Sequence, residues 1–254
     1  MLKVGELFAG IGGFGLGLER TGGFKVSWQV ENDSFALKVL KKHWPEVRRH
    51  DDVCTFPPTA VDEWKVDVIC AGFPCQDISA AGKGAGLKGE RSGLFYEVVR
   101  ITERLQPRYL LLENVAALLV RGLDEVLGSL AEIGFDTEWH CIPAAAVGAP
   151  HRRDRAFVLA YSQSLGIQRL REPGKQVSPA YVRPQIPLCR GSGSRGSFWQ
   201  TEPDVDRVVN GFSRGLDRTR RIKALGNAVV PQVVEVIANQ ILNWERSNGK
   251  NATH

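Results

Sequence analysis

Short apolar segments alternate with longer amphipathic segments through the first 160 residues of the chain. The amphipathic segments carry apolar residues three and four positions apart, as a helix with one buried face requires, and lie at 34–44, 94–105 and 123–134. The short segments are rich in strand-forming residues and are predicted strands, at 4–8, 25–30, 66–70, 108–112 and 155–160. This alternation predicts an α/β fold with a mostly parallel sheet and helices on both faces.

The regular pattern is lost near Ser162 and returns only towards the C-terminus. Residues 161–200 are rich in proline, glycine, serine and arginine, with six lysines and arginines against one acidic residue. That composition suits a basic recognition region, with a disordered basic insertion as the alternative. The closing "VVPQVVEVIANQILNWERS" predicts a helix behind a proline. We therefore expect one main domain formed by 1–160 and 204–254, and a short irregular region at 161–203.

Composition narrows the class of protein. A chain of 254 residues with 43% apolar and 24% charged residues is long enough for one large soluble domain. No apolar run approaches the expected length of a membrane span, and the N-terminus lacks a signal-peptide pattern, so we expect a cytoplasmic protein without a membrane partner. Five scattered cysteines without a CxxC pair predict neither a disulfide framework nor a zinc site. The net charge of +5 fits a polyanionic partner, although many soluble enzymes are as basic.

A glycine-rich segment, "LFAGIGGFGLGLE", follows the first predicted strand and begins a helix. Gly10, Gly12 and Gly15 match the G-x-G-x-x-G spacing, which lets a backbone turn tightly beside a nucleotide. Glu31 ends the next predicted strand, where a carboxylate suits ribose hydroxyls. This pattern alone fits a nicotinamide dehydrogenase as well as an S-adenosylmethionine enzyme.

A proline–cysteine step, in "VDVICAGFPCQDIS", follows the third predicted strand. Pro74 has a fixed φ and favours an extended Phe73, which directs Cys75 away from the sheet edge. A thiol there is a candidate nucleophile, whereas a lone cysteine is structural in most proteins. Behind it, "SAAGKGAGLKGERSG" has the composition either of a loop that closes on an anionic ligand or of a plain surface loop.

Charged residues mark two further strand ends. Glu113 ends the fourth predicted strand in "LLLENV", where a buried carboxyl group with a raised pKa is able to protonate a ring nitrogen. The alternative is a solvated strand-end carboxylate. Arg153 and Arg155, in "HRRDRAF", stand two apart as the last strand begins and are expected to share one face. Paired arginines suit an oxyanion or phosphate, with structural ion pairs as the alternative.

These motifs, in this order and at these spacings, resemble those of the DNA cytosine-5 methyltransferases. The resemblance covers about the first 160 and the last 30 residues, and rests on the glycine loop, Glu31, Asp52–Val53, "GFPCQDIS", "ENV", "HRRDR" and "ALGNAVVP". It implies a Rossmann-like S-adenosylmethionine-dependent methyltransferase fold. The short region at 161–203 implies a small bacterial or phage-type member with a shortened target-recognition region.

The resemblance implies roles for individual residues. Cys75 becomes the nucleophile, Glu113 the acid at ring N3 of cytosine, and Arg153 or Arg155 the support of the pyrimidine carbonyl. The implied cofactor contacts are Phe8, Ala9, Gly10, Ile11, Gly12, Gly13, Glu31, Asn32, Asp52, Val53, Gly72, Pro74, Leu94, Asn227 and Ala228. The implied DNA contacts are Gln76, Ser79, Lys83, Arg91, Arg169, Arg171, Arg183, Arg190 and Arg195.

The implied reaction transfers a methyl group from S-adenosylmethionine to carbon 5 of cytosine in a short duplex DNA sequence. It proceeds through a covalent Cys75 adduct at carbon 6 of a flipped-out base, leaves S-adenosylhomocysteine and needs no metal. Duplex DNA is the expected partner and a monomer the expected state. The family also includes members that accompany a restriction endonuclease, so such a companion is a further expectation.

Two departures from the family pattern stand beside this interpretation. His151 occupies a position where most members have glutamine, and "DRVVNGFSR" stands where the usual motif before the last one is expected.

Two alternative functions stay open. A tRNA-methylating branch shares most of the motifs, with a different sequence around its cysteine. A nicotinamide-dependent oxidoreductase shares the glycine loop, but has no need of "FPCQ" and "ENV" at strand ends.

Overall fold

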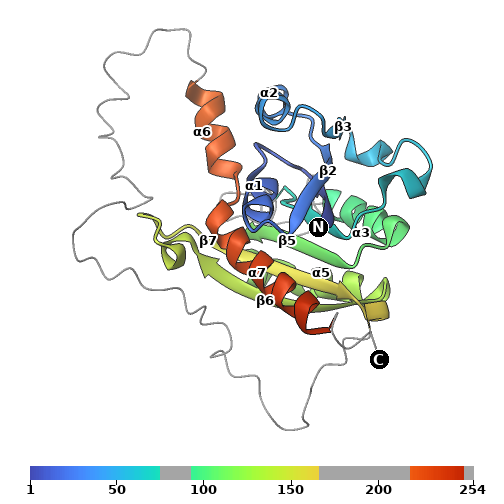
Figure 1. The fold of residues 1–254 in the computed structure, drawn as a ribbon. Helices are drawn as coiled ribbons and strands as arrows, with labels where there is room; N and C mark the ends of the chain where they lie inside the picture. Colours follow the sequence, from blue (N-terminus) through green and yellow to red (C-terminus); the bar gives the residue numbers. More distant parts are fainter. Residues whose placement is uncertain (75–92, 166–217, 249–254) are drawn as a thin grey trace.

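The structure, a computed structural model, describes residues 1–74, 93–165 and 218–248 (Figure 1). A seven-stranded sheet forms its centre, in the order β3-β2-β1-β4-β5-β7-β6. The first five of these strands are parallel, and β7 runs antiparallel to both of its neighbours. The strands span Leu2–Leu7 (β1), Phe24–Val30 (β2), Arg48–His50 (β3), Val68–Ala71 (β4), Tyr109–Val115 (β5), Phe135–Pro143 (β6) and Asp154–Ser162 (β7).

All five predicted strands are present, with ends shifted by up to three residues, and the mostly parallel sheet is confirmed. β3 and β6, which lie at the two edges of the sheet, are not among the predicted strands. β3 has only three residues, all of them polar, so no apolar pattern marks it. β6 is exposed over Glu138–Cys141, and an edge strand with solvent on both faces lacks the alternation that identifies a half-buried strand.

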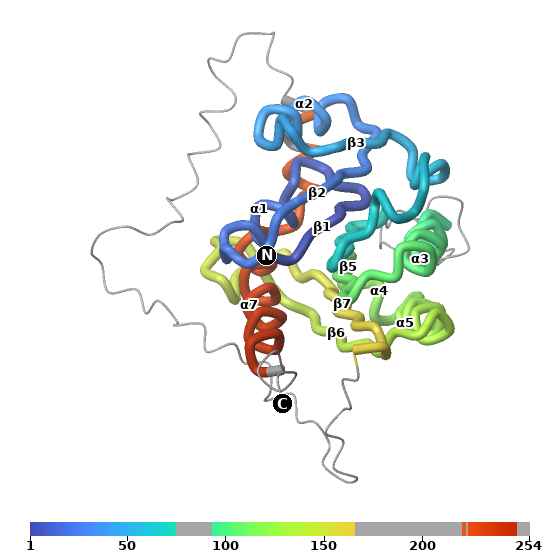
Figure 2. The backbone as a smooth tube through the Cα atoms, turned by 45° about the vertical axis from the view of Figure 1, so that its right-hand side comes forward, coloured from blue at the N-terminus to red at the C-terminus, as the bar shows by residue number. Residues whose placement is uncertain are grey.

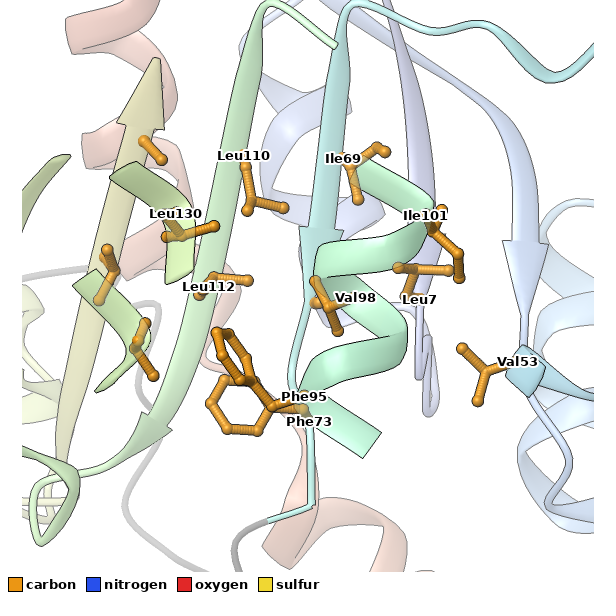
Figure 3. Packing of buried hydrophobic residues seen from close by; sticks show 14 of the residues in the cluster. Leu7, Val53, Ile69, Phe73, Phe95, Val98, Ile101, Leu110, Leu112 and Leu130 are labelled. Carbon is orange, nitrogen blue, oxygen red and sulfur yellow. The ribbon is translucent and has the colours of Figure 1, made fainter. Parts of the chain in front are cut away.

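Helices cover both faces of the sheet. On one face, α3 (Leu94–Leu105) and α5 (Leu123–Glu132) pack on side chains of the central strands. Figure 3 shows Phe95, Val98 and Ile101 of α3 against this face. On the other face, α1 (Gly13–Arg20) and α7 (Pro231–Asn248) lie together on the sheet (Figure 2).

The contact between α1 and α7 depends on glycines in the predicted nucleotide loop. A Cβ atom on Gly13 would lie 2.7 Å from the carbonyl oxygen of Val229, and one on Gly17 would lie 2.5 Å from that of Pro231. These are backbone atoms, which cannot turn away as a side chain does. The second half of the glycine-rich segment is therefore needed for helix packing, in addition to any role at a ligand.

The C-terminal helix requires a correction of the expectation about membrane-spanning length. The stretch Lys223–Ser247 is long and apolar enough to cross a membrane by length and composition alone. Five of its apolar side chains, however, lie in the core on the α1 face of the sheet, namely Val233, Val234, Ile237, Ala238 and Ile241. A helix that packs on a protein core also meets these criteria of length and composition.

Shorter elements connect the main ones. Asp33 begins α2 by accepting hydrogen bonds from the backbone N–H groups of Phe35 and Ala36. An aspartate at this position satisfies donors that the helix leaves unpaired. The elements are α2 (Ser34–His43), η1 (Val53–Thr55), η2 (Val61–Trp64), α4 (Leu118–Arg121), η4 (Ala144–Val147), η5 (Gln163–Leu165) and α6 (Arg218–Asn227).

Candidate active site

The carboxyl ends of four parallel strands lie side by side. Leu7 pairs with Val30 on one side and with Ala71 on the other, and Ala71 pairs with Leu112. The chain winds outward in opposite directions from β1 and β4, which makes the gap between them the switch point of the sheet. Ligands of open α/β sheets bind at the carboxyl ends beside such a point. The loops after β1, β2 and β4 begin at this edge, and they carry the glycine loop, Glu31 and the segment that leads into the proline–cysteine step.

The loop after β1 is held in a left-handed conformation. Phe8, Gly10 and Gly12 have φ values of 53°, 55° and 83°. A Cβ atom on Gly12 would meet the ring of Trp44 at 2.3 Å, whereas one on Gly10 would meet nothing within 4 Å. Of these two glycines, Gly12 is thus packed against the protein and Gly10 is open to a ligand.

Glu31 lies directly beside that open glycine. β2 ends at Val30, and the carboxylate of Glu31, the next residue, accepts the backbone N–H of Gly10 at 2.7 Å. It also accepts the N–H groups of Asn32 and Asp33, at 2.9 and 2.7 Å. A carboxylate offers about four acceptor positions, so this arrangement leaves room for about one ribose hydroxyl.

The predicted adenine-side residues have different surroundings. Asp52 is exposed and caps η1 by accepting the N–H of Cys54 at 2.9 Å. Val53 is buried in the core, and its carbonyl oxygen accepts a hydrogen bond from Arg100 at 3.0 Å. Leu94, the first residue of α3, is half-buried against the same core.

The end of β4 is fixed beside β5 at the catalytic side of the site. The ring of Phe73 packs on Phe95 of α3 with 5.3 Å between centroids, as Figure 3 shows. The Asn114 side chain donates a hydrogen bond to the carbonyl oxygen of Phe73 at 3.3 Å. A Cβ atom on Gly72 would lie 3.5 Å from a carboxylate oxygen of Glu113. The described chain thus approaches Glu113 and stops at Pro74.

Several predicted residues lie outside the described part of the chain. The next residue after Pro74 is Cys75, which is among them. The others are Gln76, Ser79, Lys83, Arg91, Arg169, Arg171, Arg183, Arg190 and Arg195. The assignments of these residues stay predictions.

Glu113 is a buried acid with one cationic neighbour in direct contact. It is 7% exposed, and the Nε atom of Arg155 lies 3.0 Å from its Oε1 atom. The ion pair is not aligned as a hydrogen bond, so within the described residues this oxygen has no hydrogen-bond donor. Burial raises the pKa of Glu113 and outweighs the opposing charges of Arg155 and Arg153. Of the two alternatives for Glu113, a buried acid and a solvated strand-end carboxylate, the structure shows the buried acid.

The two arginines do not share one strand face, which corrects the expectation from their spacing. β7 begins at Asp154, and Arg153 precedes it with a φ of 39°. Arg153 donates hydrogen bonds to the carbonyl oxygens of Gly226 and Ala228, at 2.7 and 2.6 Å. Arg155 alone contacts Glu113. Alternation along a strand applies only inside the strand, and the left-handed residue before it redirects the side chain.

The remaining predicted positions lie around this corner. Asn227 is exposed at the end of α6, and Ala228 follows it, with its carbonyl oxygen bound by Arg153. His151 is exposed in the segment that leads into β7. Arg153 therefore connects the predicted cofactor motif "ALGNAVVP" to the vicinity of Glu113.

Two buried polar residues at the site, Asn114 and Glu6, are not among the predicted site residues. Asn114 joins the ends of β4 and β5 as described above. Glu6, fully buried in β1, accepts the backbone N–H of Gly15 and the side-chain amide of Gln29, each at 2.7 Å. Burial raises the pKa of Glu6 to about 7. An available signal was the carboxylate in the apolar run "VGELFAG", directly before the glycine loop.

One cavity of the described chain lies apart from the site, and the same residues contain no metal cluster. A cavity of about 150 Å³ lies between β6, β7 and α7, lined by residues such as His140, Ile142 and Phe157, and shares no residue with the site. The described chain holds no group of three or more His, Cys, Asp and Glu side chains placed to bind a metal ion.

Comparison with known proteins identifies the family. A family model described as C-5 cytosine-specific DNA methylase matches residues 2–187. The chain belongs to this family. The match includes the glycine loop, Glu31, the proline–cysteine step, Glu113 and the arginines, and it favours the S-adenosylmethionine interpretation of the loop over the nicotinamide one.

Individual methylases show how much of the family this chain covers. It is 35% identical over 189 residues to the Type II methyltransferase M.Sau3AI of Staphylococcus aureus, covering 67% of this chain and 46% of the relative. It is 38% identical over 156 residues to the Type II methyltransferase M.CviJI of Paramecium bursaria Chlorella virus IL3A, covering 61% and 42%. The chain thus spans about half the length of the curated relatives it matches.

Two solved structures share the fold. One is described as a DNA modification methyltransferase encoded within a prophage of E. coli, with a TM-score of 0.55, 26% identity, and coverage of 65% of this chain and 48% of that one. The other is Spodoptera frugiperda DNMT2, with a TM-score of 0.55, 25% identity, and coverage of 69% and 53%. The Rossmann-like methyltransferase fold is thereby confirmed.

Proposed function

We propose that this protein transfers a methyl group from S-adenosylmethionine to carbon 5 of cytosine in duplex DNA. The observation that carries the proposal is the buried Glu113, ion-paired with Arg155 and placed beside the end of the strand that leads into Cys75. Family membership and the Type II methyltransferases among the relatives support cytosine as the substrate base and DNA as its carrier.

The role of Cys75 follows from the chemistry of the base. Carbon 5 of cytosine is a poor nucleophile, and addition of a thiolate to carbon 6 turns the ring into an enamine with an electron-rich carbon 5. A free thiol with a pKa of about 8.5 is only a few per cent ionised at pH 7, so the site must favour the thiolate. The cytosine must leave the duplex stack to expose its ring face, at a cost of a few kcal/mol.

The role of Glu113 follows from its burial. As carbon 6 is attacked, negative charge develops on the ring, and a protonated carboxyl group at N3 neutralises it by donating its proton. The raised pKa keeps that proton available, and Arg155 stabilises the carboxylate that forms. Once carbon 5 carries the methyl group, loss of the carbon 5 proton to a base lets the carbon–sulfur bond break and restores the thiolate. Return of the N3 proton to the Glu113 carboxylate then leaves neutral 5-methylcytosine.

The glycine loop and Glu31 fit a nucleoside cofactor. The left-handed, open Gly10 and the adjacent carboxylate would hold the ribose, with Asp52, Val53 and Leu94 towards the adenine. S-adenosylmethionine bound there supplies the electrophilic methyl group. Charge-assisted hydrogen bonds contribute about 1.5–3 kcal/mol, so Glu31→Ala should weaken its binding roughly ten- to a hundredfold in calorimetry. Unchanged affinity would contradict this role of the carboxylate.

The deciding experiment supplies labelled S-adenosylmethionine with either duplex DNA or tRNA, followed by nucleoside analysis. Label in 5-methylcytosine from DNA is the expected result, and Cys75→Ser should abolish it while leaving cofactor binding nearly unchanged, because a hydroxyl is far less ionised than a thiol. Label only in tRNA would establish the tRNA-methylating alternative. Turnover of the serine variant within about tenfold of the native protein would remove Cys75 from the mechanism.

We propose a cytoplasmic monomer as the acting form. A duplex DNA substrate supports a location inside the cell, and the Type II names of the relatives support a companion restriction endonuclease. Sedimentation of the protein with and without duplex DNA tests the oligomeric state. A stable dimer without DNA would contradict this part of the proposal.

A further inference from the structure

Arg100 of α3 joins two segments of the chain that carry predicted adenine-side residues. Its Nη2 atom donates hydrogen bonds to the carbonyl oxygens of Val53 and Cys54, at 3.0 and 3.3 Å. Val53 begins η1, and Leu94 begins the helix that carries Arg100. Figure 3 shows Val53 at the same end of the sheet as Phe95, near the beginning of α3. The arginine therefore links the two segments directly.

The turn η1 is held at both of its ends. It has only three residues, and the last carbonyl groups of so short a turn lack partners within it. Asp52 caps the beginning by accepting the N–H of Cys54 at 2.9 Å. At the other end the two carbonyl oxygens bind Arg100, which lies 47 positions after Val53 in the chain. The position of η1 thus depends on a contact from α3.

The same turn lies at the carboxyl edge of the sheet, next to Glu31. β3 ends at His50, and the backbone N–H of Glu31 donates to the carbonyl oxygen of His50 at 3.1 Å. Asp52 and Val53 follow His50 directly in the next turn of the chain. A nucleoside whose ribose is bound at Glu31 therefore has η1 beside it, and a displaced η1 would alter the adenine side of the site.

Arg100 is oriented by its own helix. Its Nε and Nη2 atoms lie 2.7 and 2.6 Å from the Oε2 atom of Glu97, one turn earlier in α3. The two side chains are 33% and 27% exposed, so water only partly screens the pair. Because Nε and Nη2 both make their contacts with the protein, Arg100 acts on η1 rather than on a ligand.

We propose that Arg100 is a positioning residue for the cofactor, which holds η1 where Asp52 and Val53 meet the adenine. The inference rests on the proposed function, and it gives a role to a residue outside the predicted cofactor contacts. Arg100 acts through the binding site and not on the reacting atoms. Its loss should therefore change the affinity for the cofactor and leave the methyl-transfer step unchanged.

The test uses three variants of α3. Arg100→Ala removes both carbonyl contacts, and Arg104→Ala removes one exposed cation from the same helix as the matched control. Arg100→Lys is the conservative variant, because both carbonyl contacts come from one nitrogen atom and a lysine ammonium also has several donors. Calorimetry with S-adenosylhomocysteine gives the affinity. Methylation of duplex DNA of mixed sequence gives kcat and the KM for S-adenosylmethionine, and thermal unfolding gives Tm.

Arg100→Ala should weaken binding of S-adenosylhomocysteine roughly tenfold and raise the KM by a similar factor, with kcat within about twofold of the native value. The lysine variant should recover most of the affinity, and Arg104→Ala should match the native protein. Native affinity in Arg100→Ala, whatever its Tm, would overturn the proposal and leave the proposed function intact. An equal loss in Arg104→Ala, or a fall in kcat without a change in KM, would do the same. Failure of the native protein to bind S-adenosylhomocysteine would overturn both.

Discussion

Burial controls the proton affinity of two carboxyl groups at the site, Glu113 at the end of β5 and Glu6 beneath the glycine loop. In each case loss of hydration is the largest cause of the raised pKa, and the neighbouring hydrogen-bond donors or cations oppose it without cancelling it. At the residue scale, therefore, the surroundings of a side chain decide its chemistry, because a strand-end glutamate in water would be ionised at neutral pH.

Glu113→Gln should reduce methylation far more than DNA binding. Glutamine keeps the size of the side chain but has no proton to give to N3, and general acid catalysis contributes roughly 10²–10⁴ in rate. Single-turnover methylation and duplex affinity, measured on the same preparation, give the two quantities. Glu132→Gln on the exposed surface of α5 is the matched control. A single-turnover rate equal to that of the native protein would remove Glu113 from the mechanism.

Glu6→Gln should stabilise the protein at alkaline pH and leave it unchanged in acid. The folded-state pKa of about 7 exceeds the ordinary value of 4.5, so the native protein loses stability as pH rises between these values. An uncharged amide removes that loss, up to about 3 kcal/mol above pH 7. The unpaired Oε1 atom of Gln29 offers the introduced amide an acceptor.

Urea unfolding at about pH 4 and pH 8 tests this prediction by the change in unfolding free energy at each pH. The exposed substitution Glu132→Gln should show no such difference. An effect of Glu6→Gln that is equal at both pH values would mean that ionisation of Glu6 does not limit stability.

At the scale of elements, the packing of α1 against α7 depends on the absence of side chains. Gly17 faces the carbonyl oxygen of Pro231 at the start of α7, so any Cβ atom there has to separate the two helices. Gly128, by contrast, lies inside α5 with nothing near its Cβ position. Gly17 is therefore needed for helix packing and Gly128 is not, and a change to alanine at each position should have opposite effects on stability.

Gly17→Ala should destabilise the fold by roughly 1–3 kcal/mol or more, as overpacking of a tight contact does. Gly128→Ala should instead stabilise it by about 0.5–1 kcal/mol, because alanine favours the helix. Chemical denaturation of the two variants gives both values. A stable Gly17→Ala protein would show that α1 and α7 are free to separate.

At the scale of the whole molecule, the chain combines a seven-stranded Rossmann-like sheet with the short region at 161–203 that we predict to recognise the target. Because the region at 161–203 is short, it is able to make only a handful of base contacts. We therefore expect a target sequence of roughly two to four base pairs. Replacing residues 169–195 by a glycine–serine linker of equal length should abolish sequence preference on random-sequence DNA. Single alanine substitutions of Arg169, Arg171, Arg183, Arg190 and Arg195 then separate two classes of contact.

A phosphate contact weakens binding to every duplex alike, and a guanine contact relaxes one position at a cost of about 1–3 kcal/mol. An unchanged methylation pattern and affinity after the replacement would exclude this region as the reader. Specificity would then come from the segment behind Cys75 or from a partner protein.

The sequence by itself determined the central elements and the chemistry at their ends. Amphipathic periods predicted α3 and α5, and apolar runs predicted the five inner strands, because these patterns arise from residues close together in the chain. The spacing of the glycine loop, Glu31, the proline–cysteine step and Glu113 identified the family for the same reason. Their order along the chain decides which strand end each one follows.

The tertiary structure alone decided what depends on residues far apart in the chain. β3 and β6 are strands because a neighbouring strand supplies their hydrogen bonds, while their own sequences are polar or exposed. Arg153 and Arg155, two residues apart, have separate partners, since one reaches Ala228 across 75 positions and the other Glu113. Burial of Glu6 and Glu113 likewise comes from the packed sheet, because desolvation depends on every element that excludes water from a side chain.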